Sequence, residues 1–255
     1  MLRLAYLLVL LIVPTTSSPA FAKHPSHWRQ KNIPVPHNFV VGYGSLVNPA
    51  SRARTLGEES ATAIPIRISA EFGYRRVWNY RVTNMSTALG LEKAKPQDAD
   101  TINGVLYAIS DNDIDALDKR ERSYDRIKIP WECIESLSWL RLPDVGDVWI
   151  YVPKADSVQL PTLNEPIIQT YIDLTMEGFL SYSEAFAAEF VETTYYWPQF
   201  WINDRLMARR PWEYTPEFSY IDRLLKKYLP QVEGESLFEE RRYPAEYSMM
   251  LNWAR

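Results

Sequence analysis

The stretch Phe39-Val40-Val41-Gly42-Tyr43-Gly44-Ser45-Leu46 predicts a buried strand that runs into a glycine-containing turn. Its first three residues favour β-structure, and two of the nine glycines of the chain follow within three positions. Asn48 and Pro49 come next, a pair that is typical of a helix N-cap and the first helical position. We therefore expect a strand over residues 39–43, a tight turn, and a short helix through residues 51–54.

The turn over residues 43–46 also predicts a site for an anion. Where a strand runs directly into the start of a helix, several backbone N–H groups come together, and such groups bind anions. Glycine allows a ligand or another backbone to approach closely, because it has no side chain. An ordinary strand–turn–helix connection without a ligand remains the simpler interpretation of these residues taken alone.

Residues 1–22 have the pattern of a secretory signal peptide. Arg3 gives the positive start, Leu4 to Val13 form an apolar run, and Ala20-Phe21-Ala22 matches an A-x-A cleavage site. The apolar run, at about ten residues, is too short to cross a membrane, which takes roughly 20 residues. We expect an exported protein, periplasmic or secreted, that is cleaved after Ala22 and has no stable membrane anchor.

The composition argues against a nucleic-acid-binding protein and against a disulfide-stabilised scaffold. The net charge of −4 becomes −5 when the leader with Arg3 is removed, whereas nucleic-acid-binding surfaces carry a basic excess. The single cysteine, Cys133, cannot form an internal disulfide. Stability must therefore come from the core, which a hydrophobic content of 46% and an aromatic content of 13% can supply.

The middle of the chain predicts a series of strands and one helix. Strand-like segments, separated by short glycine and asparagine breaks, cover residues 63–72, 74–81, 86–92, 102–109, 127–133 and 147–152. Gly104 indicates a close approach of two backbones. Ser110, with Asp113 three positions later, predicts the N-cap of a helix whose apolar residues Ile114 and Leu117 share one face.

The last third of the chain predicts helices, over residues 165–179, 182–194 and 218–228. We expect the aromatic cluster from Tyr195 to Trp201 to pack these helices onto the sheet, with ligand stacking as the alternative. The fold class is therefore mixed α/β (α+β). The predicted parts are a leader (1–22), an extended lead-in (23–37), one domain (38–210) and a C-terminal extension of unknown role (211–255).

The positions of the histidines leave few kinds of chemistry open. All three, His24, His27 and His37, precede the first predicted strand. A histidine–cysteine zinc site is therefore hard to build, and a Ser-His-Asp hydrolase would have to bring His37 to Ser45. The chain has no Walker loop and no G-x-G-x-x-G motif of the dinucleotide-binding type. A carboxylate-based reaction beside an anion-binding turn remains.

Glu121 is the candidate carboxylate. It lies in the charged run Asp118-Lys119-Arg120-Glu121-Arg122 at the end of the predicted helix, and Tyr124 and a strand follow. A junction between a helix and a strand can direct a side chain across a cavity. The alternative is a solvated helix-end charge, which is the usual state of a glutamate in such a run.

Val41-Gly42-Tyr43-Gly44-Ser45-Leu46, together with Leu117-Asp118-Lys119-Arg120-Glu121-Arg122-Ser123-Tyr124, closely resembles the γ-glutamylcyclotransferase superfamily, with its ChaC-like and AIG2-like branches. In that family a Tyr-Gly-Ser turn binds the γ-glutamyl end of the substrate, and a glutamate in an R-E-x-x-Y context acts as base. Tyr43 and Glu121 are 78 positions apart, which fits the family spacing. The resemblance covers residues 38–152, and residues 165–205 resemble the C-terminal helices of some members.

The resemblance implies a small, mostly antiparallel β-barrel with flanking helices and a helical C-terminal extension. It implies that Glu121 is catalytic and that the substrate-binding residues are Tyr43, Gly44, Ser45, Leu46 and Tyr124. The implied reaction is metal-independent, needs no cofactor, and cyclises small γ-glutamyl peptides or amines, glutathione included, to 5-oxoproline. A binding module for the same ligands without turnover is one alternative, and an interaction protein that uses its helical last third is another.

Overall fold

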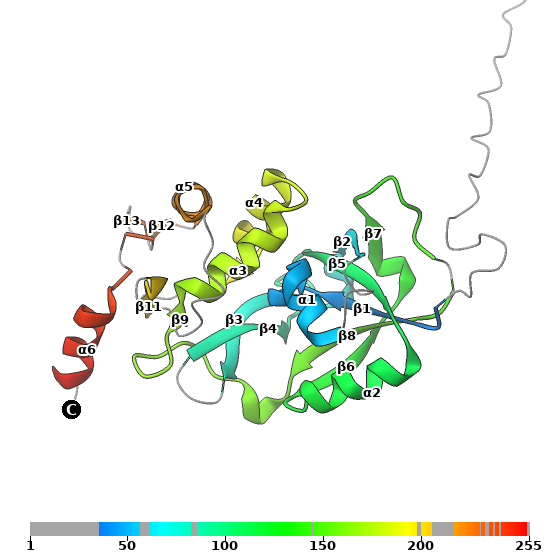
Figure 1. Cartoon of the computed structure of the whole chain (residues 1–255), viewed down its shortest axis with the longest axis horizontal. Helices are drawn as coiled ribbons and strands as arrows, with labels where there is room; N and C mark the ends of the chain where they lie inside the picture. Colours follow the sequence, from blue (N-terminus) through cyan, green and yellow to red (C-terminus); the bar gives the residue numbers. More distant parts are fainter. Residues whose placement is uncertain are drawn as a thin grey trace, which may run out of the picture.

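The computed structural model describes residues 36–56, 62–82, 86–143, 145–197, 200–205, 217–229, 231–232, 235–236, 238–239 and 241–253. The predicted signal peptide and most of the predicted lead-in lie outside these residues. Figure 1 shows the main sheet on one side of the molecule and helices α5 and α6 on the other, with α3 and α4 between them. Within the described ranges, no helix is both long and apolar enough to cross a membrane.

The main sheet has six strands in the order β6-β8-β1-β5-β2-β7. Their bounds are Asn38–Gly42 (β1), Ile64–Ile68 (β2), Ile102–Ile109 (β5), Tyr124–Ile129 (β6), Ile134–Ser136 (β7) and Asp147–Pro153 (β8). The β1–β8 pair is parallel and the other four pairs are antiparallel. Val40 packs into one hydrophobic core, whereas Phe39 and Val41 pack into another, so β1 is buried on both faces.

The remaining strands form smaller sheets. A three-stranded sheet contains β3 (Tyr74–Val82), β4 (Ser86–Lys93) and β10 (Thr194–Tyr195). Two-stranded sheets pair β9 (Ile167–Ile168) with β11 (Trp201–Ile202) and β12 (Gln231–Val232) with β13 (Glu235–Ser236). The mixed α/β class, the mostly antiparallel pairing and the flanking helices are confirmed. The predicted closed barrel is wrong, because the β3–β4 hairpin pairs with β10 from the helical part and not with an edge of the main sheet.

Two helices, α1 and α2, lie in the first half of the chain, and α3 to α6 lie in the second half. Their bounds are Pro49–Leu56 (α1), Asp111–Arg120 (α2), Gln169–Leu180 (α3), Glu184–Glu192 (α4), Phe218–Tyr228 (α5) and Pro244–Trp253 (α6). Two predicted start signals are confirmed. The Asn48 side chain accepts hydrogen bonds from the N–H groups of Ala50 and Ser51 at 2.9 and 3.2 Å, and Ser110 accepts one from Asp113 at 3.1 Å.

The aromatic cluster packs the helical part against β3, as expected from the sequence. The ring centroid of Trp197 lies 5.1 Å from that of Trp78 on β3 and 5.6 Å from that of Trp201. All three side chains are buried. Pro198 and Gln199 lie outside the described residues. The cluster therefore forms the hydrophobic contact between the C-terminal helical part and β3.

Candidate active site

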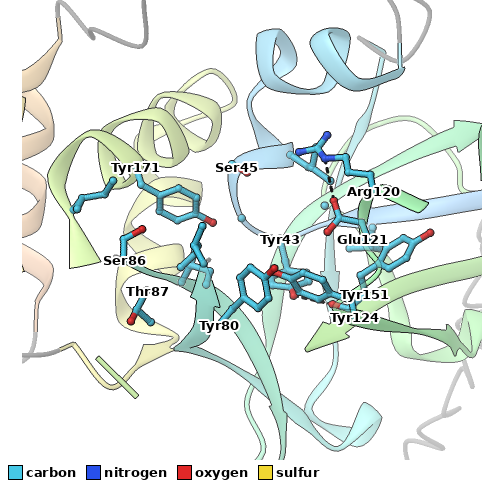
Figure 2. Close-up of a pocket in the computed structure, with 18 of the residues that line it drawn as sticks. Tyr43, Ser45, Tyr80, Ser86, Thr87, Arg120, Glu121, Tyr124, Tyr151 and Tyr171 are labelled. Atoms are coloured by element: carbon cyan, nitrogen blue, oxygen red, sulfur yellow. Dashed lines mark hydrogen bonds and ion pairs between the residues drawn. The ribbon is translucent and has the colours of Figure 1, made fainter. Parts of the chain in front are cut away.

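A cavity of about 460 Å³ lies where the turn after β1, the end of α2 and the start of α3 meet. Its wall contains every residue that the sequence analysis selected: Tyr43, Gly44, Ser45, Leu46, Glu121 and Tyr124. Figure 2 shows Glu121 paired with Arg120 on one side, Tyr171 near Ser86 and Thr87 on the other, and Tyr80 and Tyr124 between them. The fold thus brings the two motifs together, and the roles of the six residues stay predictions.

Gly104 on β5 and Gly44 in the turn each lie where a side chain would press against a neighbouring group. A Cβ on Gly104 of β5 would collide with the carbonyl group of Gly42, which confirms the close approach predicted there. A Cβ on Gly44 would lie 3.1 Å from the hydroxyl oxygen of Tyr171 and 3.5 Å from Leu89 Cδ1. The turn therefore packs directly against the opposite wall of the cavity, and a side chain at Gly44 would narrow that space.

Arg52 supports the turn from the side that faces away from the cavity. Its side chain is fully buried, and Nη1 donates hydrogen bonds to the carbonyl oxygens of Leu46 and Val47 at 2.8 and 2.6 Å. Arg52 does not line the cavity, so these two carbonyl oxygens point into the protein. Carbonyl oxygens carry partial negative charge and repel anions. Because these two oxygens face away from the cavity, the cavity side of the turn is more favourable for an anion.

Arg76 on β3 connects the turn to the rest of the fold. It is fully buried and donates to the carbonyl oxygens of Tyr43 and Asn103 at 3.3 and 2.8 Å. It also donates to the Asn103 side chain at 2.8 Å and to the hydroxyls of Thr193 and Thr194 at 2.9 and 2.8 Å. Burial lowers the pKa of Arg76 to about 9, so the guanidinium stays charged at neutral pH. One buried cation therefore fixes Tyr43 against β5 and the end of α4.

The cavity has an unusually aromatic wall. Tyr43 donates its hydroxyl hydrogen to the Tyr151 carbonyl oxygen at 2.7 Å, and the rings of Tyr80 and Tyr124 lie 4.4 Å apart. Burial raises the pKa values of Tyr43, Tyr124 and Tyr171 above their ordinary value. These phenols are therefore neutral at physiological pH. They supply hydrogen-bonding groups to the cavity without adding negative charge.

Glu121 caps the C-terminus of α2 and is held by its own backbone. Its N–H donates to the Leu117 carbonyl oxygen at 2.8 Å, and its carbonyl oxygen accepts from Tyr124 N–H at 2.8 Å. The Glu121 side chain is only 16% exposed, with Arg120 Nε 3.3 Å from Oε1. Burial raises the pKa of Glu121, and the charge of Arg120 opposes that rise. The alternative of a solvated helix-end charge is therefore wrong.

Arg126, which lies on β6 just after this charged run, has a different partner. Arg126 Nε lies 3.3 Å from the Asp118 carboxylate, and its guanidinium lies over the Trp149 ring. Arg120 is the arginine of the run that lines the cavity. It is therefore the neighbour that tunes the proton affinity of Glu121.

The hydrolase alternative for Ser45 does not fit the fold. Ser45 lines the cavity, but His37 is exposed and lies at the opposite end of β1. The five residues of that strand put about 13 Å between its ends. His37 therefore cannot act on Ser45. Within the described part of the chain, no three His, Cys, Asp or Glu side chains are grouped in a way that could hold a metal ion.

Several residues of the site were not predicted from the sequence. Tyr80, Tyr151 and Tyr171 line the cavity, and Arg52 and Arg76 support the turn. Arg76 is one of three arginines in β3, with Arg75 and Arg81, so no signal in the sequence distinguished it as the buried one. A break in pairing between Trp78 and Tyr80 interrupts the simple alternation of side chains. For this reason the periodicity of β3 could not assign Tyr80 to the cavity.

Comparisons with known proteins agree with the resemblance. Residues 40–169, just over half of the chain, match the model of the family described as "Gamma-glutamyl cyclotransferase, AIG2-like". A search of curated proteins found no match.

Solved structures give distant likenesses. Bacillus subtilis YkqA is 17% identical with a TM-score of 0.40, over 55% of this chain and about half (47%) of YkqA. A structure titled gamma-glutamyl cyclotransferase is 10% identical with a TM-score of 0.40, over 84% of this chain and 98% of that one. A yeast γ-glutamyl cyclotransferase specific to glutathione is 14% identical with a TM-score of 0.32, over 85% and 98%. On the family match, the chain belongs to the gamma-glutamyl cyclotransferase, AIG2-like family.

Proposed function

We propose that this protein is a γ-glutamylcyclotransferase that converts small L-γ-glutamyl peptides or amines into 5-oxoproline and a free amine. The observation that carries the proposal is the buried carboxylate of Glu121 in the same cavity as the Tyr43 to Leu46 turn. Family membership supports the reaction type. Glutathione is among the proposed substrates.

In this mechanism the substrate supplies its own nucleophile. Its α-amine attacks the γ-carbonyl carbon, a new C–N bond closes a five-membered ring, and the C–N bond to the leaving amine breaks. Holding the substrate curled makes the attack intramolecular, which can lower the barrier by roughly 7–11 kcal/mol. No nucleophile from the protein is needed.

Glu121 would move the proton that this reaction must transfer. It takes a proton from the α-ammonium group, which frees the amine to attack, and gives that proton to the leaving nitrogen. The second proton that the attacking nitrogen loses follows the same route, so Glu121 ends each cycle unchanged. A carboxylate works best in this role when its pKa approaches the working pH. Burial raises the pKa of Glu121 in that direction.

The turn and the tyrosines would hold the substrate. Backbone N–H groups of the turn would bind the α-carboxylate, and Arg52 keeps the carbonyl oxygens of Leu46 and Val47 away from it. Of the neutral hydroxyls on the cavity wall, those of Tyr124 and Tyr171 can donate to the oxyanion that develops on the γ-carbonyl oxygen, because the Tyr43 hydroxyl already donates to the Tyr151 carbonyl oxygen. Arg120 lines the same cavity beside Glu121, so its guanidinium supplies a positive charge for a carboxylate of the substrate.

The assay for the proposal is 5-oxoproline release from a panel of γ-glutamyl compounds. We expect turnover of substrates with a free α-amine and none of their N-acylated counterparts, because the blocked nitrogen cannot attack. Chromatographic measurement of 5-oxoproline checks both the turnover of the free-amine substrates and its absence with the N-acylated ones. Release from an N-acylated substrate would refute the mechanism, and binding of the free-amine compounds without release would favour the binding-module alternative.

We further propose that the protein is exported. The support is the sequence pattern of residues 1–22, with Arg3, the apolar run and Ala20-Phe21-Ala22. N-terminal sequencing of the protein from its natural source should give Lys23 as the first residue. Recovery of a soluble protein that still begins at Met1 would contradict this proposal.

A further inference from the structure

One wall of the cavity comes from the start of α3. Thr170 and Tyr171 are the first-turn residues that line it, and they lie just beyond residues 40–169, which match the family model. The Tyr171 ring meets Trp78 edge-on at 6.0 Å between centroids, and its hydroxyl lies against the Gly44 turn. The position of this helix start therefore decides the shape of the cavity beside the turn.

The first turn of α3 is capped by a residue from much later in the chain. Ile168, at the N-cap position, makes no side-chain cap bond. Instead, Asp204 Oδ1 accepts from Thr170 N–H at 2.9 Å, and Oδ2 accepts from the Thr170 hydroxyl at 2.7 Å. Asp204 is only 6% exposed. Its negative charge at a helix N-terminus also interacts favourably with the helix dipole.

Arg205, the residue after Asp204, forms a second set of contacts with α3. Arg205 donates to both oxygens of Asp173 on α3 at 2.7 Å and to both oxygens of Asp222 on α5 at 2.8 and 2.9 Å. Arg241 donates to Gln169, the first residue of α3, at 2.6 Å. Bonds of this kind between charged groups are strong and directional. The start of α3 is thus held by side chains that follow their partners in the chain by 32 to 72 positions.

We propose that Asp204 is a positioning residue of the active site, which acts through Thr170 and Tyr171. Asp204, Arg205 and Arg241 are then structural components of the substrate cavity, because they hold the helix start that forms its wall. For its kinetic test, this inference rests on the proposed cyclotransferase activity. Glu121 lies on the other side of the cavity, at the end of α2, so loss of the cap should disturb substrate binding more than proton transfer.

The test compares Asp204→Ala with a matched helix cap elsewhere. Ser183 caps α4 by accepting from Phe186 N–H at 3.0 Å, and α4 does not line the cavity. Asp204→Ala should raise KM for the γ-glutamyl substrate by about 5- to 100-fold and keep kcat within about threefold. Asp204→Asn should restore most of the affinity, because its amide oxygen still accepts from Thr170 N–H. Ser183→Ala should leave KM unchanged.

Hydrogen exchange of the full-length protein gives a readout that does not need activity. Asp204→Ala should speed exchange in the first turn of α3, whereas Ser183→Ala should speed it only at the start of α4. Unchanged KM in Asp204→Ala, or an equal rise in KM in Ser183→Ala, would overturn the proposal. If Asp204→Ala does not fold, Arg205→Lys replaces it. That variant keeps the charge but loses the two-pronged contacts, so KM should again rise, and an unchanged KM would count against the proposal.

The proposed cyclotransferase function and the positioning role of Asp204 can fail separately. If the wild-type protein releases no 5-oxoproline from any γ-glutamyl compound, the proposed function is wrong. The hydrogen-exchange measurement then tests the role of Asp204 without any activity assay. Faster exchange in the first turn of α3 in Asp204→Ala supports it, and unchanged exchange there overturns it.

Discussion

Replacing Glu121 by glutamine should lower turnover by about 10²–10⁴-fold, with little change in substrate affinity. Glutamine keeps the size and the hydrogen-bonding reach of the side chain but cannot accept the proton from the substrate. The side chain is largely buried in the cavity wall, so a loss of this size would be a loss of chemistry at the site. Steady-state kinetics on a folded variant measure kcat and KM separately.

Glu132→Gln is the matched control for this substitution. Glu132 is exposed and lies outside the cavity, so the same chemical change should leave turnover as it is. Near-normal turnover in Glu121→Gln would remove Glu121 from the mechanism. A loss shared by both variants would point to a cause other than the proton shuttle.

The pH profile gives a second readout of the same role. The base works only when deprotonated, so kcat/KM should fall as the pH drops through the pKa of Glu121. Burial raises that pKa, and the charge of Arg120 lowers it. Arg120→Gln should therefore move the acidic limb to higher pH. If the acidic limb of the kcat/KM profile of Arg120→Gln stays at the wild-type pH, the limb reflects the titration of a group other than Glu121.

Arg76→Met should lower the free energy of unfolding by about 3–5 kcal/mol. The methionine fills part of the space but leaves the Tyr43 and Asn103 carbonyl oxygens without their donor. The hydroxyls of Thr193 and Thr194 lose the same partner. Buried acceptors without a donor cost about 1–3 kcal/mol each, and some will rearrange. Urea unfolding measures the change.

The neighbouring arginine provides the control. Arg75 lies on the same strand, but its side chain is 19% exposed and pairs with Glu92 near the surface. Arg75→Met should cost no more than about 1 kcal/mol, because partly exposed ion pairs contribute little. Equal losses in the two variants would show that Arg76 has no special part in the fold.

Local signals in the sequence predicted many of the elements. Residues 102–109 and 218–228 were predicted with the bounds that the structure has. The capping residues Asn48 and Ser110 marked two helix starts, because a side-chain oxygen before a helix satisfies free N–H groups in any protein. The six residues of the predicted site also share one cavity.

Features that depend on distant partners were not predictable. The short strand β7 (Ile134–Ser136) was missed, since three residues carry little periodicity. Barrel closure was expected, but the partner of the β3–β4 hairpin is β10, more than 100 positions after the start of β3. Asp204 was overlooked because it caps a helix that precedes it by 34 positions, whereas cap patterns concern adjacent residues.

The late position of Asp204 has a consequence for the timing of assembly. A chain made or translocated from its N-terminus presents Tyr43 long before Asp204 and Arg241, which hold the opposite wall. At a synthesis rate of about 5–20 residues per second, that interval is on the order of 10–40 s. During it the turn and Glu121 exist, but the cavity between them has no fixed wall. On the proposed mechanism, activity must therefore wait until residues 204–241 have been made, and a product truncated before residue 204 would have its cavity left open on one side.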